Sequence, residues 1–130
     1  MTVEVAAGII QDSAGRYLIT RRREGSHLAG LWEFPGGKRR AGETLEACLQ
    51  RELKEELGAS FGVGEQVETV RWEYQEKTVV IHFYRCQLAA GAVEPRESQE
   101  IAWVAPEQFA GYEFPAADAQ MLARLRSRER

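Results

Sequence analysis

At 130 residues, the chain is long enough to bury a core of its own and is expected to form a single domain over residues 1–130. Hydrophobic residues make up 44% and charged residues 28%, which is typical of a soluble globular protein. The net charge of −3 argues against a dedicated binder of nucleic acid. No apolar run approaches the ~20 residues of a membrane span, and no leader pattern is present, so a cytoplasmic protein without membrane contact is expected.

The predicted elements are strands interrupted by two helices. Strands are expected at residues 3–11, 16–22, 31–34, 68–75, 78–89 and 100–105, where apolar and polar residues alternate between turn signals. A first helix is predicted from residues 42–44 to Leu57, and Gly58 takes the position that ends a helix in a left-handed conformation. A helical turn at 106–109 and an amphipathic helix at 116–130 follow. The pattern predicts an α/β or α+β layered domain with a mixed sheet.

Two cysteines, Cys48 and Cys86, lie in segments with apolar periodicity. They are too few for a disulfide framework and lack the spacing of a metal site. Both are therefore expected to be small core residues.

The first helix carries three carboxylates, Glu52, Glu55 and Glu56, at the spacing i, i+3 and i+4. Like charges at that spacing destabilise a helix by a few tenths of a kcal/mol per pair. The three acids project onto nearly the same sector as the apolar residues of the first half of the helix, whereas Arg51 projects well off that sector. A solvated acidic face is one interpretation. The other is a divalent cation such as Mg²⁺, which prefers oxygen ligands.

The segment before the helix favours the cation. Residues 35–37 form a Pro-Gly-Gly elbow between strand and helix, and glycines there let the backbone approach a metal or phosphate closely. The spacing of the fixed residues resembles the Nudix box, the signature of the Nudix hydrolases. The matching positions are Gly37, Glu43, Arg51, Glu52, Glu55, Glu56 and Gly58. Ala59 is the one departure, because the family prefers a larger aliphatic residue there.

The resemblance implies a mixed sheet sandwiched between helices, with the box forming a loop–helix–loop motif. It further implies that Glu52, Glu55 and Glu56 hold Mg²⁺, or Mn²⁺ as a substitute, together with the Gly36 carbonyl. Glu52 would also orient or deprotonate the attacking water. The residues expected to support the box rather than do chemistry are Gly37, Glu43, Arg51 and Gly58.

Residues 19–38, 94–103 and 114–122 resemble the MutT-like subgroup of that family, which sanitises oxidised guanine nucleotides. By that resemblance, Glu97 is a further metal ligand or base. Arg22 and His27 would contact the nucleotide, and Phe34 would line the base pocket. Simpler interpretations are an exposed arginine, a solvated loop histidine and a core phenylalanine. The aromatic residues of the 68–75 and 78–89 strands could stack on a base, but core packing is expected.

Asp118 departs from the subgroup, which has Asn at this position. An ionised Asp only accepts hydrogen bonds, whereas a protonated one donates as well. Burial in a base pocket could raise its pKa and keep the proton, although a role in the first turn of the last helix is the simpler alternative. An acceptor also suits the exocyclic amine of cytosine, and residues 29–34 and 115–118 resemble Nudix enzymes that hydrolyse CTP and modified cytosine nucleotides.

The expected activity is Mg²⁺-dependent hydrolysis of a nucleoside triphosphate to monophosphate and pyrophosphate, with 8-oxo-dGTP as the first candidate substrate. CTP or a modified cytosine nucleotide is the alternative, and a non-catalytic Nudix nucleotide-binding module is the alternative of another class. The partner is expected to be a small nucleotide, and the protein a monomer or homodimer. The basic residues near position 126 suit the C-terminus of a helix, so no stable nucleic-acid binding is expected.

Overall fold

The computed structural model describes residues 1–26, 28–97 and 99–128. The strands are β1 (Thr2–Ile10), β2 (Tyr17–Arg21), β3 (Trp32–Glu33), β4 (Gly36–Lys38), β5 (Ser60–Glu73), β6 (Thr78–Ala90) and β7 (Ile101–Val104). The α-helices are α1 (Leu45–Leu57) and α2 (Ala119–Arg128), and two short 3₁₀ helices are η1 (Pro106–Gly111) and η2 (Ala116–Asp118). No helix in these three ranges is long and apolar enough to cross a membrane.

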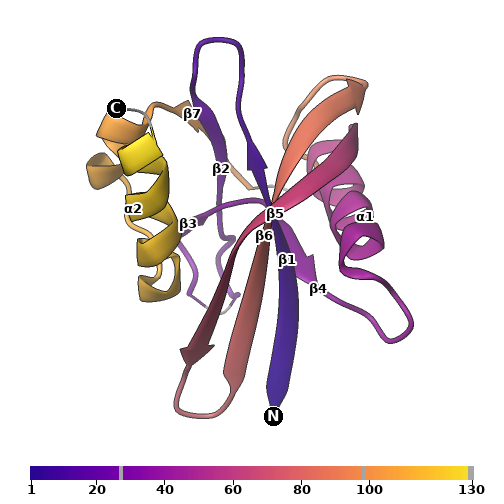
Figure 1. Ribbon diagram of the computed structural model, residues 1–130, viewed down its shortest axis with the longest axis vertical. Helices are drawn as coiled ribbons and strands as arrows, with labels where there is room; N and C mark the ends of the chain where they lie inside the picture. The colour runs from indigo at the N-terminus through magenta and orange to yellow at the C-terminus, as the bar shows by residue number, and fades with distance from the viewer. Residues whose placement is uncertain (27, 98, 129–130) are drawn as a thin grey trace.

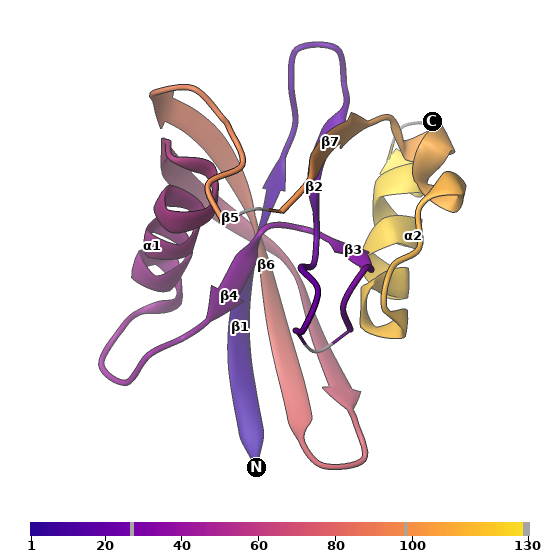
Figure 2. The same ribbon diagram turned by 180° about the vertical axis from the view of Figure 1, so that it is seen from behind.

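The strands form two sheets. The four-stranded sheet has the order β4-β1-β6-β5, and the three-stranded sheet has the order β3-β2-β7. β1 pairs in parallel with β6, whereas the other pairings between the named strands are antiparallel. Helix α1 lies on one side of the four-stranded sheet and α2 on the other (Figures 1 and 2). The predicted mixed α+β fold, with a sheet between helices, is therefore confirmed.

Both faces of β1 are buried in its second half, residues 6–10, which explains the apolar run there. Ala7 and Ile9 belong to the core on the α2 side, and Ala6 and Ile10 belong to the core on the α1 side. Alternate side chains of a strand point to opposite faces, so one strand supplies both cores. The strand after it in the sheet, β6, does the same with Phe83 on the α2 side and Tyr84 on the α1 side.

Helix α1 begins and ends as the sequence predicts. The Thr44 side chain accepts a hydrogen bond from the Ala47 N–H at 3.1 Å, which satisfies one of the free N–H groups of the first turn. Gly58 ends the helix in the left-handed conformation, with φ of 70°. The expected burial of both cysteines is confirmed, since Cys48 of α1 and Cys86 of β6 are free and buried.

Some predicted bounds were wrong. β5 begins at Ser60, whereas the sequence predicts the strand only from residue 68, because glycines and two register shifts between residues 63 and 68 obscure the alternation. The strand at 31–34 is reduced to β3, and the glycine elbow itself pairs with β1 as β4. The last α-helix starts at Ala119, because residues 116–118 form the 3₁₀ turn η2.

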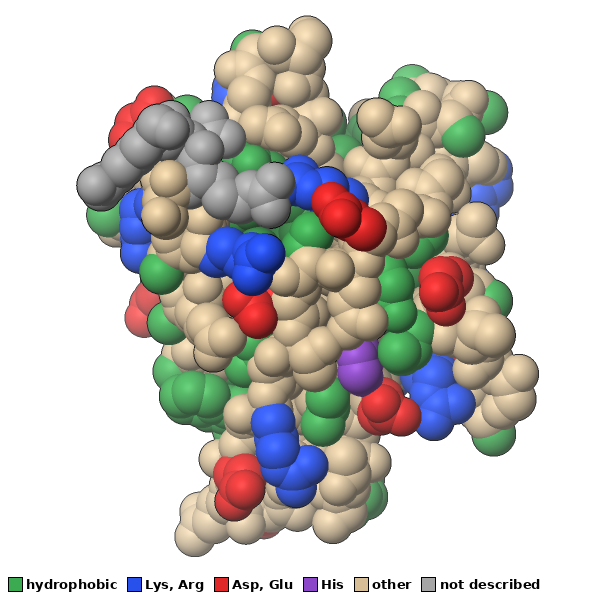
Figure 3. Space-filling model, in the orientation of Figure 1, with side chains coloured by type: hydrophobic (Ala, Val, Ile, Leu, Met, Phe, Trp, Pro, Cys, Tyr) green, Lys and Arg blue, Asp and Glu red, His purple; other side chains and the backbone are tan. Residues whose placement is uncertain are grey.

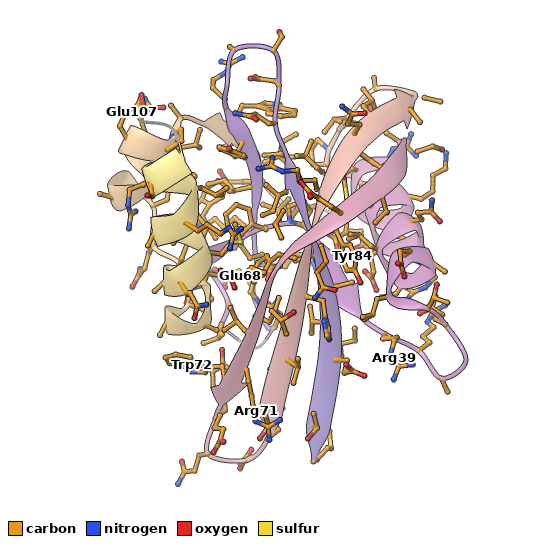
Figure 4. All side chains as sticks on the ribbon, in the orientation of Figure 1. Arg39, Glu68, Arg71, Trp72, Tyr84 and Glu107 are labelled. Carbon is orange, nitrogen blue, oxygen red and sulfur yellow. The ribbon has the colours of Figure 1, made fainter. Side chains whose placement is uncertain are left out.

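The aromatic side chains of the β5–β6 hairpin have different surroundings. Phe83 and Tyr84 are core residues, as expected. Trp72 is 38% exposed and lies towards the β5–β6 turn near Arg71 (Figure 4). Tyr74, in contrast, lines a pocket. On the face seen in Figure 3, the acidic and basic side chains that are drawn are interspersed and form no continuous basic stripe.

Candidate active site

The glycine elbow brings the backbone of β4 against both β1 and α1. The Gly8 N–H donates to the Pro35 carbonyl at 2.8 Å, which fixes the elbow to β1. Gly36 has φ of 155°, and a Cβ at this residue would overlap the Ala6 carbonyl. A Cβ on Gly37 would overlap the Glu52 carboxyl group. The two glycines are therefore required by the close approach of backbone and carboxylate.

Arg51 lies at the centre of an ion-pair network that fixes the box. Its Nε donates to Glu43 Oε2 at 2.7 Å and its second terminal nitrogen to Glu43 Oε1 at 3.0 Å, a two-point contact. The hydrogen bond with Arg51 lowers the pKa of Glu43 to about 2. The Lys38 carbonyl accepts a further hydrogen bond from Arg51 at 3.1 Å, so α1, β4 and the loop between them are tied together.

The helical projection places Arg51 well off the sector of the three acids, but in the structure its side chain contacts two of them. The remaining guanidinium nitrogen reaches Glu52 Oε2 at 2.9 Å and Glu55 Oε1 at 3.4 Å. The projection follows Cα directions, but the long arginine side chain bends along the helix to the neighbouring carboxylates. Arg51 thus supplies part of the positive charge that the acidic face needs.

Glu56 lies deepest in the acidic cluster and is the least compensated. Burial raises its pKa well above the usual range, and the negative charges of Glu33, Glu52 and Glu97 raise it further. Burial also raises the pKa of Glu52, although the hydrogen bond from Arg51 opposes the shift. Among the described contacts, Arg51 is ion-paired with Glu52 at 2.9 Å and with Glu55 at 3.4 Å, whereas no ion pair of Glu56 is present. The cluster therefore carries more carboxylates than the protein neutralises.

This cluster fits a divalent cation by the chemistry of its donors. Carboxylate oxygens and the carbonyl of Gly36, which lines the same cleft, are the hard ligands that Mg²⁺ and Mn²⁺ take. Within the described residues, no group of three acidic, His or Cys side chains is arranged to hold a metal ion as it stands. The Glu52 carboxylate is turned onto Arg51 at 2.9 Å. A bound cation would compete with Arg51 for that oxygen.

Two pockets meet at this cluster. The polar one is lined by Arg21, Arg22, Arg23, Glu56, Glu97 and Gln99, among others. The second, mainly apolar pocket lies over the α2 side of β1 and β6, and its wall includes Phe34, Tyr74, Ile81, Ala117 and Asp118. Arg22, Glu33 and Gly36 line both. The two pockets therefore adjoin at these three residues, and together they are referred to as the cleft.

The apolar pocket contains two carboxyl groups with raised pKa values. Burial raises the pKa of Asp118 to about 7, and the charge of Glu33 adds to the shift while Arg22 opposes it. Glu33 is ion-paired with Arg22 at 2.9 Å, but burial still raises its pKa. The Phe34 ring packs edge-on against Phe83, with centroids 6.0 Å apart. Phe34 is thus both a core residue and a pocket wall.

Most residues that the sequence singles out lie along this cleft. Arg22, Phe34, Gly36, Glu56, Glu97 and Asp118 line it, and Glu43, Arg51 and Gly58 support α1 from outside. Glu55 is at the periphery, with a 41% exposed side chain. His27 lies outside the described residues. The sequence analysis did not single out Glu33 or Gln99 as site residues. The one available signal for Glu33 is its place between two aromatic residues on a short strand. Nothing in the local sequence marks Gln99.

Comparison with known proteins agrees with this geometry. Residues 6–124 match the NUDIX domain family. The chain is 41% identical over 123 residues to a Haemophilus influenzae protein named 8-oxo-dGTP diphosphatase, covering 95% of this chain and 90% of the relative. It is 36% identical over 120 residues to an Escherichia coli CTP pyrophosphohydrolase, covering 92% and 88%. The structure of a MutT protein from Methanosarcina mazei Go1 superimposes with a TM-score of 0.86 at 29% identity, covering 99% and 96%. The chain belongs to the Nudix family and is a Nudix hydrolase.

Proposed function

We propose that this Nudix hydrolase cleaves a nucleoside triphosphate to monophosphate and pyrophosphate in a Mg²⁺-dependent reaction, with oxidised guanine nucleotides, 8-oxo-dGTP first among them, as substrates. One observation carries the proposal: an apolar pocket that contains the buried Asp118, whose pKa burial raises to about 7, shares three lining residues with the polar pocket that contains Glu56 and Glu97. The relatives named 8-oxo-dGTP diphosphatase support the same substrate.

The carboxylates have distinct proposed roles. Glu52, Glu55, Glu56 and Glu97, with the Gly36 carbonyl, would hold Mg²⁺, for which Mn²⁺ can substitute. When bound, the metal supplies charge neutralisation at the phosphates and lowers the pKa of a water molecule. Glu52 is proposed to take the proton from that water, and Glu97 is the second candidate for this role.

The arginines that line the polar pocket suit the phosphate chain. Arg21, Arg22 and Arg23 follow one another at the end of β2 and line the polar pocket that contains Glu56 and Glu97. Guanidinium groups bind phosphate oxygens with two parallel hydrogen bonds. A triphosphate between this wall and the metal would hold the reacting phosphorus near the box.

Asp118 is proposed to read the base. A neutral carboxyl group donates one hydrogen bond and accepts another, as the Asn of the MutT-like subgroup does. A protonated Asp118 can therefore donate to O6 of 8-oxo-guanine and accept from its N7–H. Unmodified guanine has no proton on N7, so the second hydrogen bond is lost and a buried polar group remains unpaired.

A hydrolysis panel tests the proposal. The substrates are dGTP, 8-oxo-dGTP, CTP, dCTP, 5-methyl-dCTP and a nucleoside diphosphate sugar, each at matched low concentration with Mg²⁺. We expect the highest kcat/KM for 8-oxo-dGTP, with pyrophosphate as the second product. Release of inorganic phosphate alone, or equal kcat/KM for dGTP and 8-oxo-dGTP, would contradict it.

A cytosine nucleotide is the second candidate, because the pKa of Asp118 lies close to neutral pH. With a pKa of about 7, a large share of Asp118 is ionised at neutral pH and accepts only, which suits the exocyclic amine of cytosine. The CTP pyrophosphohydrolase relative supports this alternative. A higher kcat/KM for CTP or 5-methyl-dCTP in the panel would select it. Nucleotide binding without any turnover would select the non-catalytic module instead.

A further inference from the structure

Gln99 lies between the two acidic residues that come from distant parts of the chain. Its side-chain nitrogen donates to the Glu56 main-chain carbonyl at 3.0 Å, and its side-chain oxygen accepts from the Glu97 main-chain N–H at 2.8 Å. A carbonyl only accepts and an N–H only donates, so these two partners fix which end of the amide is which. Gln99 also lines the polar pocket together with Glu56 and Glu97.

The loop that carries Glu97 is already fastened to the end of α1 by its backbone. The Arg96 N–H donates to the Glu56 carbonyl at 2.8 Å, and the Glu94 N–H donates to the Leu57 carbonyl at 3.0 Å. These carbonyls belong to the last turn of the helix, whose acceptors have no partner within the helix. Figure 2 shows the segment after β6 running beside α1 before it reaches β7.

These backbone contacts hold residues 94–96, but of the described contacts only the Gln99 amide reaches the Glu97 main chain. Without that amide, Glu97 would sit one residue beyond the last anchored position, in a loop whose backbone can rotate. We propose that Gln99 is a positioning residue, whose amide bridge holds the Glu97 carboxylate in register with Glu56 for the hydrolytic reaction. The inference rests on the proposed role of Glu97 at the metal.

The variant Q99M separates this role from a general structural one. Met matches Gln in length and removes both hydrogen bonds, while the backbone contacts of Glu94 and Arg96 keep the loop attached. Q66M is the matched control, because Gln66 also makes two side-chain hydrogen bonds, both through its side-chain nitrogen, with Thr69 and His82, but lies on β5 away from the cleft. The melting temperatures of the two variants should be similar.

We expect Q99M to lower kcat about tenfold with KM for the nucleotide unchanged, as for other groups that orient metal ligands. Mn²⁺ binding without nucleotide, followed by electron paramagnetic resonance, should weaken by a similar factor. Q66M should retain wild-type values of kcat and Mn²⁺ affinity. The double variant E97Q/Q99M should be no slower than E97Q alone, since Gln99 acts through Glu97.

The positioning role of Gln99 would be overturned by wild-type kcat and Mn²⁺ affinity in Q99M, or by losses in Q99M and E97Q that multiply in the double variant. The E97Q variant by itself tests the proposed metal role of Glu97, independently of Gln99. If E97Q has wild-type kcat and Mn²⁺ affinity, the metal role of Glu97 falls, and the inference falls with it. If E97Q is impaired and Q99M is not, only the positioning role of Gln99 is wrong.

Discussion

Two carboxyl groups of the cleft, the buried Asp118 and the partly buried Glu56, have different surroundings. Asp118 lies in an apolar pocket, where keeping a proton costs less than burying a charge. Glu56 lies among other carboxylates, where the repulsion can be relieved by a proton or by a cation. Raised pKa values from burial and specific neighbours mark functional sites more often than structural ones. The same physical effect thus suits the two roles proposed for these residues, a hydrogen-bond donor at Asp118 and a metal ligand at Glu56.

Asp118→Asn should stabilise the protein increasingly as pH rises. Burial raises the pKa of Asp118 from 3.8 to about 7, so the folded state binds the proton more tightly than the unfolded state. The wild type therefore loses stability as pH rises from about 4 through 7, on the order of a few kcal/mol, whereas Asn does not titrate. Melting temperatures measured between pH 5 and 8 should diverge, with the variant higher at pH 8. Melting temperatures of the wild type and the variant that change in parallel with pH would contradict the effect of burial on Asp118.

The same variant tests base recognition. Asn donates and accepts without a proton, so Asp118→Asn should keep or improve kcat/KM for 8-oxo-dGTP at pH 8 and lower it for cytosine nucleotides. A collapse of activity on 8-oxo-dGTP would count against the proposed contact.

Glu52→Gln should leave the fold intact and lower kcat about 10²- to 10⁴-fold, the usual range for loss of a general base. The amide keeps the shape of the side chain but cannot take a proton from water. Steady-state rates with Mg²⁺ measure the loss of kcat, and far-ultraviolet circular dichroism checks that the fold is intact. Near-wild-type turnover would reassign the base, with Glu97 as the next candidate.

At the scale of elements, the site depends on one contact between β4 and α1. The elbow has no side chain at Gly37, where the Glu52 carboxyl group approaches the backbone. Arg51 holds both elements from the other side through Glu43 and the Lys38 carbonyl. Local patterns predict this helix well, because capping residues and apolar spacing are local. They do not predict which carboxylates the Arg51 side chain contacts, because the fold decides which of them lie within its range.

Gly37→Ala should reduce kcat by at least tenfold, because the added Cβ overlaps the Glu52 carboxyl group and must displace it. Gly111→Ala is the control, since a Cβ at Gly111 has no neighbour within 4 Å. Rates and melting temperatures of both variants test the contact. Equal activity of Gly37→Ala and Gly111→Ala would show that the close approach is not needed for catalysis.

At the scale of the whole molecule, the cleft forms where the four-stranded sheet, β2, β3, α1 and the segment before α2 meet. The two predicted helices and most strands follow from periodicity and turn residues. The early part of β5 does not, because its register shifts break the alternation. Glu33 and Gln99 could not be predicted as site residues, since the Arg22 partner of Glu33 and the Glu56 partner of Gln99 are brought to them by tertiary structure.

Adding Mg²⁺ should raise the melting temperature, because a ligand that binds the folded state stabilises it and here also relieves repulsion among the carboxylates. The pKa values of Glu52 and Glu56 are raised, so the metal-free fold loses stability as pH rises and these groups ionise. The Mg²⁺-induced increase should therefore be larger at pH 8 than at pH 5.5. Removal with EDTA should reverse it, and Glu56→Gln should reduce it. An increase that is independent of pH and of Glu56 would place the cation elsewhere.

The ratio of kcat/KM for 8-oxo-dGTP to that for dGTP tests the proposed base recognition most directly when it is measured with Mg²⁺ at pH 6, where a carboxyl group with a pKa of about 7 is mostly protonated. A pocket that pairs with both edge atoms of the oxidised base and adjoins the carboxylate cluster predicts a ratio of at least about 10². Activity with both substrates should disappear with EDTA. A ratio near one, or turnover that survives the chelator, would contradict the account.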